Sequence, residues 1–184
     1  VTNYNTSTLQ KFDGVFRYSK LVGLIDDVDD SVVSNITTVK VRKPFTPTLN
    51  SSARYDIYFR NAFYNPHTGH NADMGGILSS SGFKVSGNTN EMFLDDDGTG
   101  NVRRYYLDES GVKTYDNSTQ GTINYATGQI TINSLNVTSI SNIRGSTSTV
   151  IELTVIPNSN DIVPVRNTVV EIDVSNSSFL VEQD

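Results

Sequence analysis

The chain has 184 residues, of which 36% are hydrophobic and 18% are charged, and its 14 Lys and Arg face 20 Asp and Glu for a net charge of −6. This length suits one ordinary domain or two small ones, and the acidic balance without a basic cluster excludes a nucleic-acid-binding surface. No apolar run is long enough to span a bilayer, and the absence of cysteine excludes disulfides and thiolate metal sites. Because the chain begins at Val1 rather than at a methionine, we expect it to be part of a longer protein.

The one helical region that the sequence predicts covers residues 6–30. Apolar residues recur at helical spacing from Leu21 to Val28, and Asp13 is the candidate N-cap. The acidic residues at 26–30 lack the spacing of a ligand pattern, so we interpret them as a solvated or partner-facing surface.

A break at two prolines follows the first predicted strand, residues 32–42. Pro44 and Pro47 should end this strand and mark a boundary near residues 43–52. We therefore predict a linking region at residues 1–48, with a helical segment and a strand, and a β-rich domain at residues 49–184. A further division of that domain near residue 120 is left open.

Short alternating strands dominate the rest of the chain. The clearest signal is the hairpin at 121–133, where Ile123 and Tyr125 alternate with polar residues, Ile130 and Ile132 do the same, and Gly128 lies between the two runs. Residues 55–59, 102–107, 150–156 and 170–174 show the same alternation. The predicted fold class is mainly β, with antiparallel sheets packed like a sandwich and one helical segment near the N-terminus.

The strongest resemblance to a ligand motif is the acidic run that begins at Asp95. Asp95, Asp97 and Thr99 stand at positions 1, 3 and 5 of a calcium loop, with Gly100 at position 6. Position 12 is Tyr106, where such a loop needs a bidentate glutamate, and the flanking residues show strand patterns. We interpret the run as a hairpin turn rich in residues that tolerate a left-handed backbone.

Both histidines lie in one loop. His67, His70 and Asp73 are the residue types of a zinc or iron site and would suit a metal-dependent hydrolase. Pro66 and Gly69 argue against the helix that would bring the two histidines together. We interpret the segment as a flexible surface loop, and we predict no metal, no cofactor, no catalytic residue and no enzymatic activity for the chain.

Several strings at both ends and in the middle of the chain share one resemblance. They are Asn3-Tyr-Asn-Thr, the run from Leu9 to Leu21 with Lys11-Phe12-Asp13-Gly14, the acidic run at 93–101, the hairpin at 121–131, and the segment at 156–167 with its two prolines. Together they resemble the baseplate wedge proteins of T-even-like, contractile-tailed bacteriophages. The resemblance is to the C-terminal region of the large wedge subunit, whose copies form the inner ring around the tail hub.

The resemblance implies a structural protein of the virion that is assembled in the host cytoplasm. Such a protein pairs with a second copy of itself and with other wedge proteins, binds neither nucleic acid nor membrane, and takes part in the rearrangement that accompanies contraction. A symmetric self-contact must be self-complementary. We expect the interface to include Phe12, Phe16, Leu21, Asp161 and Arg166.

The alternative is a carbohydrate-binding or adhesin β-sandwich. Its binding face would combine Tyr105 and Tyr106 with the loop from Asp95 to Asp97. Calcium dependence would distinguish the two functions, because the binding module should be stabilised by calcium and the structural protein should not.

Overall fold

The computed structural model describes residues 1–165 and 168–180. Their contacts divide the chain into two compact units. The terminal unit combines residues 1–38 with the residues from Ser159 onward, and the sheet unit comprises Val39–Asn158. The predicted division at residue 48 concerns independently folding domains and stays a prediction.

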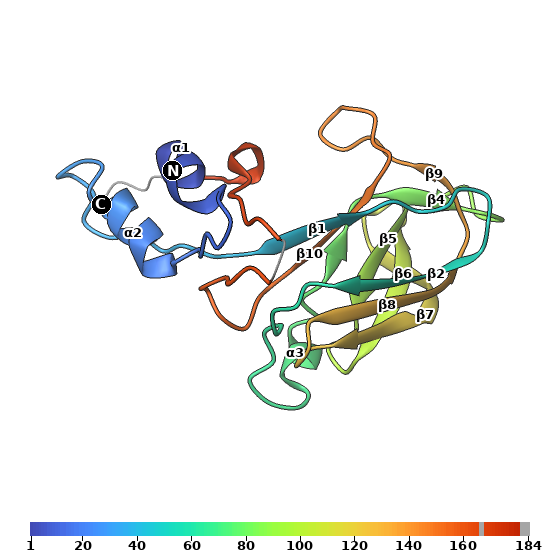
Figure 1. Ribbon diagram of the computed structural model, residues 1–184. Helices are drawn as coiled ribbons and strands as arrows, with labels where there is room; N and C mark the ends of the chain where they lie inside the picture. The colour runs from blue at the N-terminus through green and yellow to red at the C-terminus, as the bar shows by residue number, and fades with distance from the viewer. Residues whose placement is uncertain (166–167, 181–184) are drawn as a thin grey trace. The chain divides into compact units, whose positions relative to one another are not determined.

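The sheet unit is built on one continuous antiparallel sheet, which confirms the predicted mainly β fold (Figure 1). The strand order is β1-β10-β3-β5-β6-β7-β8-β2, and β9 joins through β4, which pairs with β5. The strands are β1 Val41–Phe45, β2 Ala53–Tyr58, β3 Ser79–Ser80, β4 Phe83–Val85, β5 Met92–Asp96, β6 Asn101–Leu107, β7 Lys113–Asn124, β8 Gln129–Leu135, β9 Val137–Ile140 and β10 Ile151–Val155.

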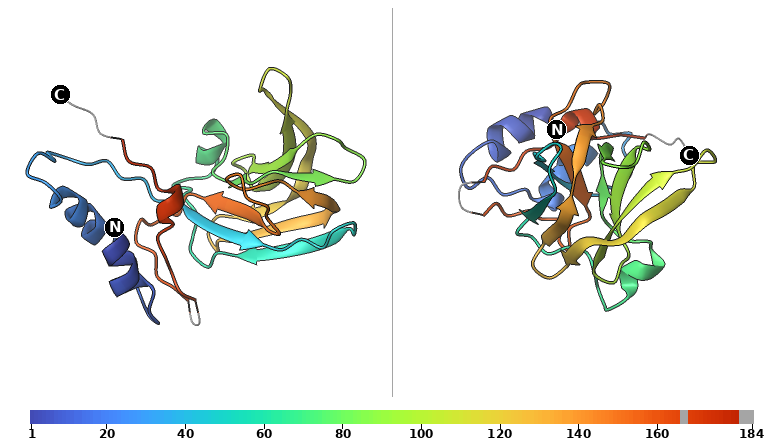
Figure 2. Two further views of the ribbon diagram at one scale, coloured as in Figure 1. Left: turned by 90° about the horizontal axis from the view of Figure 1, so that it is seen from above. Right: turned by 90° about the vertical axis from the view of Figure 1, so that its right-hand side faces the viewer.

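This sheet curls around its own core until its two end strands meet (Figure 2). The Lys43 side chain on β1 donates a hydrogen bond to the Tyr58 carbonyl on β2 at 2.6 Å. The rings of Phe45 and Tyr55 from the same two strands lie 5.1 Å apart. The two edges are therefore covered by each other, which is one way in which β proteins protect unpaired strands.

The core of the sheet unit consists of the apolar residues that alternate along these strands. Phe83, Met92, Leu94, Ile130 and Leu135 have no exposed surface. Full burial of one such side chain stabilises the folded state by about 1.5–3 kcal/mol.

The hairpin between β7 and β8 confirms the clearest local prediction. Ile123 pairs with Ile130 in register, and the turn ends at Gly128, whose φ is +67°. Gly121 also has to be a glycine, because a Cβ there would lie 1.9 Å from the carbonyl oxygen of Thr131. Tyr125 lies in the turn and not in the strand.

Two strand predictions near the first boundary are wrong. Residues 32–40 of the predicted strand at 32–42 form no strand, and β1 instead begins at Val41 and runs through Pro44, which pairs with Glu152. Proline is tolerated there because β1 pairs on one side only, with β10, so a missing N–H on its other side breaks no ladder.

The terminal unit holds the helices near the N-terminus, but the predicted helix over residues 6–30 is broken. The observed elements are α1 Thr2–Tyr4, the π-helical turn η1 Asn5–Leu9 and α2 Tyr18–Asp26. The chain leaves the helical path between η1 and α2, and a Cβ on Gly14 would lie 2.4 Å from the carbonyl oxygen of Leu9. A continuous helix is therefore replaced by a tight reversal that packs backbone on backbone.

The C-terminal part of this unit also differs from the prediction. Residues 170–173 form no strand, and a short 3₁₀ turn, η2, covers Val174–Asn176. The segment is instead held by Asn5, whose side chain accepts a hydrogen bond from the N–H of Ile172 at 2.8 Å and donates one to the carbonyl of the same residue at 3.2 Å. The side chain of Asn5 thus makes the two backbone hydrogen bonds that a neighbouring strand would make if residues 170–174 formed the predicted strand.

Candidate functional site

The start of α2 brings together residues that lie more than 140 positions apart in the chain. Asp161 accepts a hydrogen bond from the backbone N–H of Tyr18 at 2.8 Å and an ion pair from Arg17 at 2.9 Å. These two interactions, the backbone bond first, hold the pKa of Asp161 below its usual value. Asp161 thereby satisfies one of the free N–H groups at the helix start.

Asp13 does not cap the helix, so that prediction is wrong. It lies in the reversal before α2 with a φ of +65°, and the N-cap position is Arg17, whose side chain makes no capping bond. A local sequence pattern cannot reveal a cap that is supplied by a residue at the other end of the chain.

The proposed interface residues occupy different environments within the terminal unit. Phe12 is 83% exposed, whereas Phe16 and Leu21 are buried. Phe16 is also tied to Ile162 by two backbone hydrogen bonds of 2.9 and 3.0 Å. Arg166 lies outside the described residues.

The terminal unit also carries much apolar surface for its small core. Its buried apolar side chains are Tyr4, Leu9, Phe16, Leu21 and Ile162. Its strongly exposed ones are Phe12, Val28, Val33, Ile36, Phe179 and Leu180. Exposed apolar side chains are candidates for contact with a partner.

In the sheet unit, the acidic run after Leu94 is the most heavily bonded polar cluster. Asp96 has no exposed surface, and its carboxylate accepts bonds from the N–H groups of Ile77 and Leu78 at 2.6 and 2.7 Å. It also accepts bonds from the Gly98 N–H at 3.2 Å and the Tyr125 hydroxyl at 2.5 Å. Burial and the Asp96 carboxylate raise the pKa of Tyr125. Asp96 therefore anchors the loop before β3 to the sheet.

Asp95 points to the opposite side of β5 and is 2% exposed. Arg103 and Lys113 pair with its two oxygens at 2.9 and 2.8 Å, and the Tyr115 hydroxyl donates to it at 2.8 Å. Burial lowers the pKa of Lys113, but the bond to Asp95 outweighs this effect and the net shift is upward. The guanidinium of Arg103 lies 4.2 Å from the centre of the Tyr115 ring, which adds a cation–π contact.

Asp97 organises the turn itself. Its carboxylate accepts the backbone N–H groups of Thr99 and Asn101 at 2.8 and 3.0 Å, and the Asn101 side chain at 2.6 Å. Burial raises the pKa of Asp97, but the hydrogen bonds from Asn101 and Thr99 prevail and lower the pKa to about 2. The predicted hairpin turn is confirmed, because β5 and β6 pair antiparallel on either side of it.

The three carboxylates do not converge on one point, as calcium ligands would. Asp95 and Asp96 face opposite sides of the sheet, and Asp97 bonds its own turn. Asp95 and Asp96 belong to β5 and not to the turn, and their burial differs from the prediction. Met92, Leu94 and Asp96 alternate along β5, and this alternation places the three side chains on the same buried face of the strand.

The histidine loop contains a short helix that its sequence did not predict. The short helix α3, His70–Asp73, begins directly after Gly69, whose φ is +82°. It brings the Nδ1 of His70 to 3.1 Å from the Nε2 of His67, so the expectation that the two rings would stay apart is wrong. Within the described part of the chain, no three His, Cys, Asp or Glu side chains form a group that could hold a metal ion.

Tyr105 and Tyr106 do not form one binding face, contrary to the alternative interpretation. Tyr106 packs against the core, whereas Tyr105 stacks on Phe93 with ring centres 5.6 Å apart and meets Tyr115 at 5.7 Å. Adjacent residues of a strand point to opposite faces, so this separation follows from the strand itself.

The polar clusters thus hold backbone segments in place, and several apolar side chains of the terminal unit are exposed. No helix in the described residues is long and apolar enough to cross a membrane. Residues 1–44 match the family model described as baseplate structural protein gp6, C-terminal domain III. The match covers less than half of the chain and supports a structural role in a phage tail baseplate. No curated protein and no solved structure matches the chain.

Proposed function

We propose that this chain is part of the large baseplate wedge protein and that its terminal unit joins it to a second copy in the inner ring of a contractile tail. The observation that carries the proposal is the match over residues 1–44, which covers the segment that exposes Phe12, Val28, Val33 and Ile36. Burial of apolar surface is the main driving force of protein association. The matched segment is therefore where a partner gains most by binding.

The environments of the candidate residues support different tasks for them in the proposed interface. Phe12 is exposed and makes the contact, whereas Phe16 and Leu21 are buried and hold the segment in shape. Asp161 fixes the start of α2 through Tyr18, and so orients the exposed side chains of that helix. We extend the interface to Arg166 as a prediction from the sequence.

The two phenylalanines offer a direct test of self-association. Light scattering during size-exclusion chromatography of the chain should give a dimer, with and without calcium or EDTA. Phe12→Ser should give a monomer, and at concentrations low enough for the wild-type chain to be monomeric the two should share one unfolding temperature, because Phe12 is exposed in the single chain. Phe16→Ser should lower that temperature, because loss of a buried phenylalanine costs about 3–5 kcal/mol.

Val112→Ser is the matched control, because Val112 is an exposed apolar residue of the sheet unit at 59% exposure. It should leave the dimer intact. A wild-type chain that stays monomeric at high concentration, or a Phe12→Ser variant that dimerises as well as wild type, would contradict the proposed self-contact.

The wider role is assembly with other wedge proteins in the host cytoplasm and rearrangement of the ring on contraction. The nearly closed sheet with its continuous buried core supports this proposal, because such a unit can keep its fold while its contacts with neighbours change. Copurification of the full-length protein with wedge proteins from disrupted virions tests the assignment. Recovery with head or neck proteins instead would refute it.

A further inference from the structure

Residues 33–39 lie between α2 and β1 and have no strand partner in the single chain. They form neither helix, turn nor strand, and Figure 1 shows them as an open trace that leads into β1. Five of the seven residues are Val, Ile or Thr, the types that favour strands. Val33 is 92% exposed and Ile36 is fully exposed. We call residues 33–39 the unpaired segment.

One edge of the unpaired segment is held within the terminal unit. The Tyr18 hydroxyl donates a hydrogen bond to the Thr37 carbonyl at 3.1 Å, and the Asn35 side chain donates one to the Asp26 carboxylate at 2.5 Å. In an extended chain the backbone N–H and C=O groups of successive residues point to opposite edges. The odd-numbered residues therefore turn their backbone groups toward the edge that Tyr18 occupies.

The other edge carries the backbone groups of Ser34, Ile36 and Thr38. None of these groups is hydrogen-bonded within the part of the chain that the structure describes. An edge with several unpaired N–H and C=O groups is a template for pairing with another chain, and recognition by strand addition uses such edges. The free edge therefore fits an extended strand supplied from outside the chain.

The sequence of the unpaired segment matches itself when two copies run antiparallel. With Ile36 opposite Ile36 of the second copy, Val33 lies opposite Val39, and Ser34 lies opposite Thr38. These pairs join apolar with apolar and hydroxyl with hydroxyl side chains, which are favourable cross-strand neighbours. A two-fold axis through Ile36 makes the contact self-complementary, as a symmetric dimer requires.

The charges that flank the unpaired segment favour the same antiparallel arrangement. Four aspartates lie before it, at positions 26, 27, 29 and 30, and three basic residues follow it, Lys40, Arg42 and Lys43. Antiparallel pairing brings the acidic end of each copy to the basic end of the other, with Lys40 diagonal to Asp30. Parallel pairing would place like charges together. Charge complementarity therefore selects a second copy in one orientation.

We propose that the unpaired segments of two copies form an antiparallel pair of strands about a two-fold axis at Ile36. The backbone groups of Ser34, Ile36 and Thr38 bond those of Thr38, Ile36 and Ser34 in the second copy. This inference rests on the proposed self-association and gives it a register. A two-stranded ribbon alone is marginally stable, so the backbone hydrogen bonds act together with the apolar contact made by Phe12.

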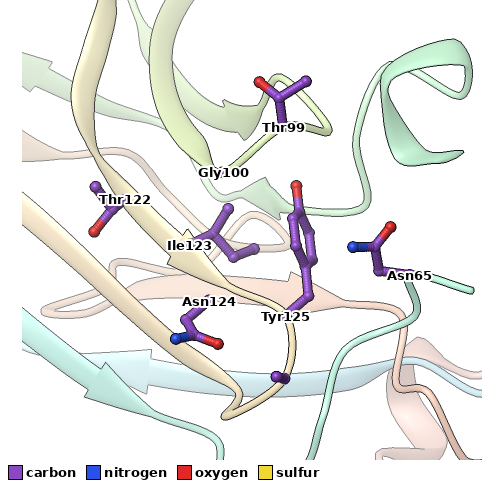
Figure 3. Close-up of a pocket in the computed structure, with 8 residues that line it drawn as sticks. Asn65, Thr99, Gly100, Thr122, Ile123, Asn124 and Tyr125 are labelled. Carbon is purple, nitrogen blue, oxygen red and sulfur yellow. The ribbon is translucent and has the colours of Figure 1, made fainter. Parts of the chain in front are cut away.

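A single cysteine reports the register, because the chain has none of its own. Opposed residues of an antiparallel ladder have Cα atoms about 5.5 Å apart, which a disulfide can bridge. Ile36→Cys should therefore form a covalent dimer under mild oxidation, as seen by electrophoresis without reductant. Val33→Cys should not, since the two copies of residue 33 lie six residues apart along the ladder, about 20 Å. Thr122→Cys, at an exposed position of β7 that Figure 3 shows, measures random collision.

Proline substitution tests which edge is bonded. Thr38→Pro removes an N–H that the pairing uses, and it does so twice in the symmetric dimer. It should raise the dissociation constant about tenfold or more, as measured by analytical ultracentrifugation. Val39→Pro is the matched control, because the Val39 N–H points to the other edge, and it should dimerise as wild type does. Both variants should fold, because neither N–H is hydrogen-bonded within the described residues.

The proposal is overturned if Ile36→Cys cross-links no faster than Val33→Cys or Thr122→Cys, or if Thr38→Pro and Val39→Pro dimerise equally well. A wild-type chain that dimerises, together with an Ile36→Cys variant that stays free of cross-links, refutes the strand pairing alone and leaves the Phe12 contact standing. A wild-type chain that stays monomeric refutes both.

Discussion

The terminal unit and the sheet unit use the same residue types for different purposes. The sheet unit buries most of its large apolar side chains in one continuous core, and its edge strands cover each other. The terminal unit buries few apolar side chains and leaves Phe12, Val33 and Ile36 exposed. The first arrangement gives stability to the chain by itself, whereas the second gains stability when a partner covers it.

Aspartates show the same contrast. Asp96 is buried in the sheet unit and holds four donors, while Asp161 is at the surface of the terminal unit and holds two. A buried carboxylate with several donors is costly to remove, because each donor is left without water. An exposed carboxylate is easily replaced by solvent. Substitution of an aspartate in each unit therefore measures how much the stability of that unit depends on its carboxylates.

The largest effect is expected for Asp96→Ala. It leaves the buried N–H groups of Ile77 and Leu78 and the Tyr125 hydroxyl unpaired, which should lower the free energy of unfolding by about 3 kcal/mol or more. Urea denaturation measures the loss. Asp116→Ala is the control, since that carboxylate pairs with Arg104 near the surface, and it should cost about 1 kcal/mol or less. Equal losses would remove the distinction between buried and surface carboxylates.

A smaller effect is expected from the titration of Asp97. The pKa of Asp97 is about 2 in the folded chain and 3.8 ordinarily, so the stabilisation is present above pH 4 and is lost as the pH falls toward 2. After allowance for solvent screening, it amounts to about 1 kcal/mol. The difference in unfolding free energy between wild type and Asp97→Asn should therefore shrink between pH 5 and pH 2, by about this amount. A difference that stays constant over this range would show that Asp97 does not titrate in the turn.

The smallest and most local effect is expected for Asp161→Ala. Loss of the carboxylate frees the N–H of Tyr18, so amide hydrogen exchange should become faster in the first turn of α2. Exchange in the sheet unit should not change. Asp13→Asn is the control, because asparagine tolerates the positive φ of that position, and it should leave α2 as it is. Faster exchange throughout the chain would mean that the two units unfold as one.

Local pattern and local turn chemistry account for what could be predicted of the fold. Alternation located β2, β10 and the β7–β8 hairpin, because side-chain period follows from strand geometry alone. Gly128 marked the hairpin turn because few other residues adopt its positive φ. The turn that Asp97 bonds was predictable for the same reason.

The predictions that failed depended on contacts between distant parts of the chain. Pro44 lies within a strand because only the sheet order makes β1 an edge. The cap of α2 is Asp161 because the chain returns to that helix after more than 140 residues. In the candidate site, the place of Asp95 and Asp96 depended on donors from three other segments of the sheet unit.

By itself, therefore, the sequence determined three properties of this protein. They are its mainly β fold, the position of its clearest hairpin turn, and its resemblance to a phage baseplate protein. Each of these properties resides in neighbouring residues or in recognisable strings. Only the tertiary structure decided which carboxylates are buried and which apolar side chains stay exposed. These depend on which distant segments meet, because burial and hydrogen-bond partners are properties of the assembled packing.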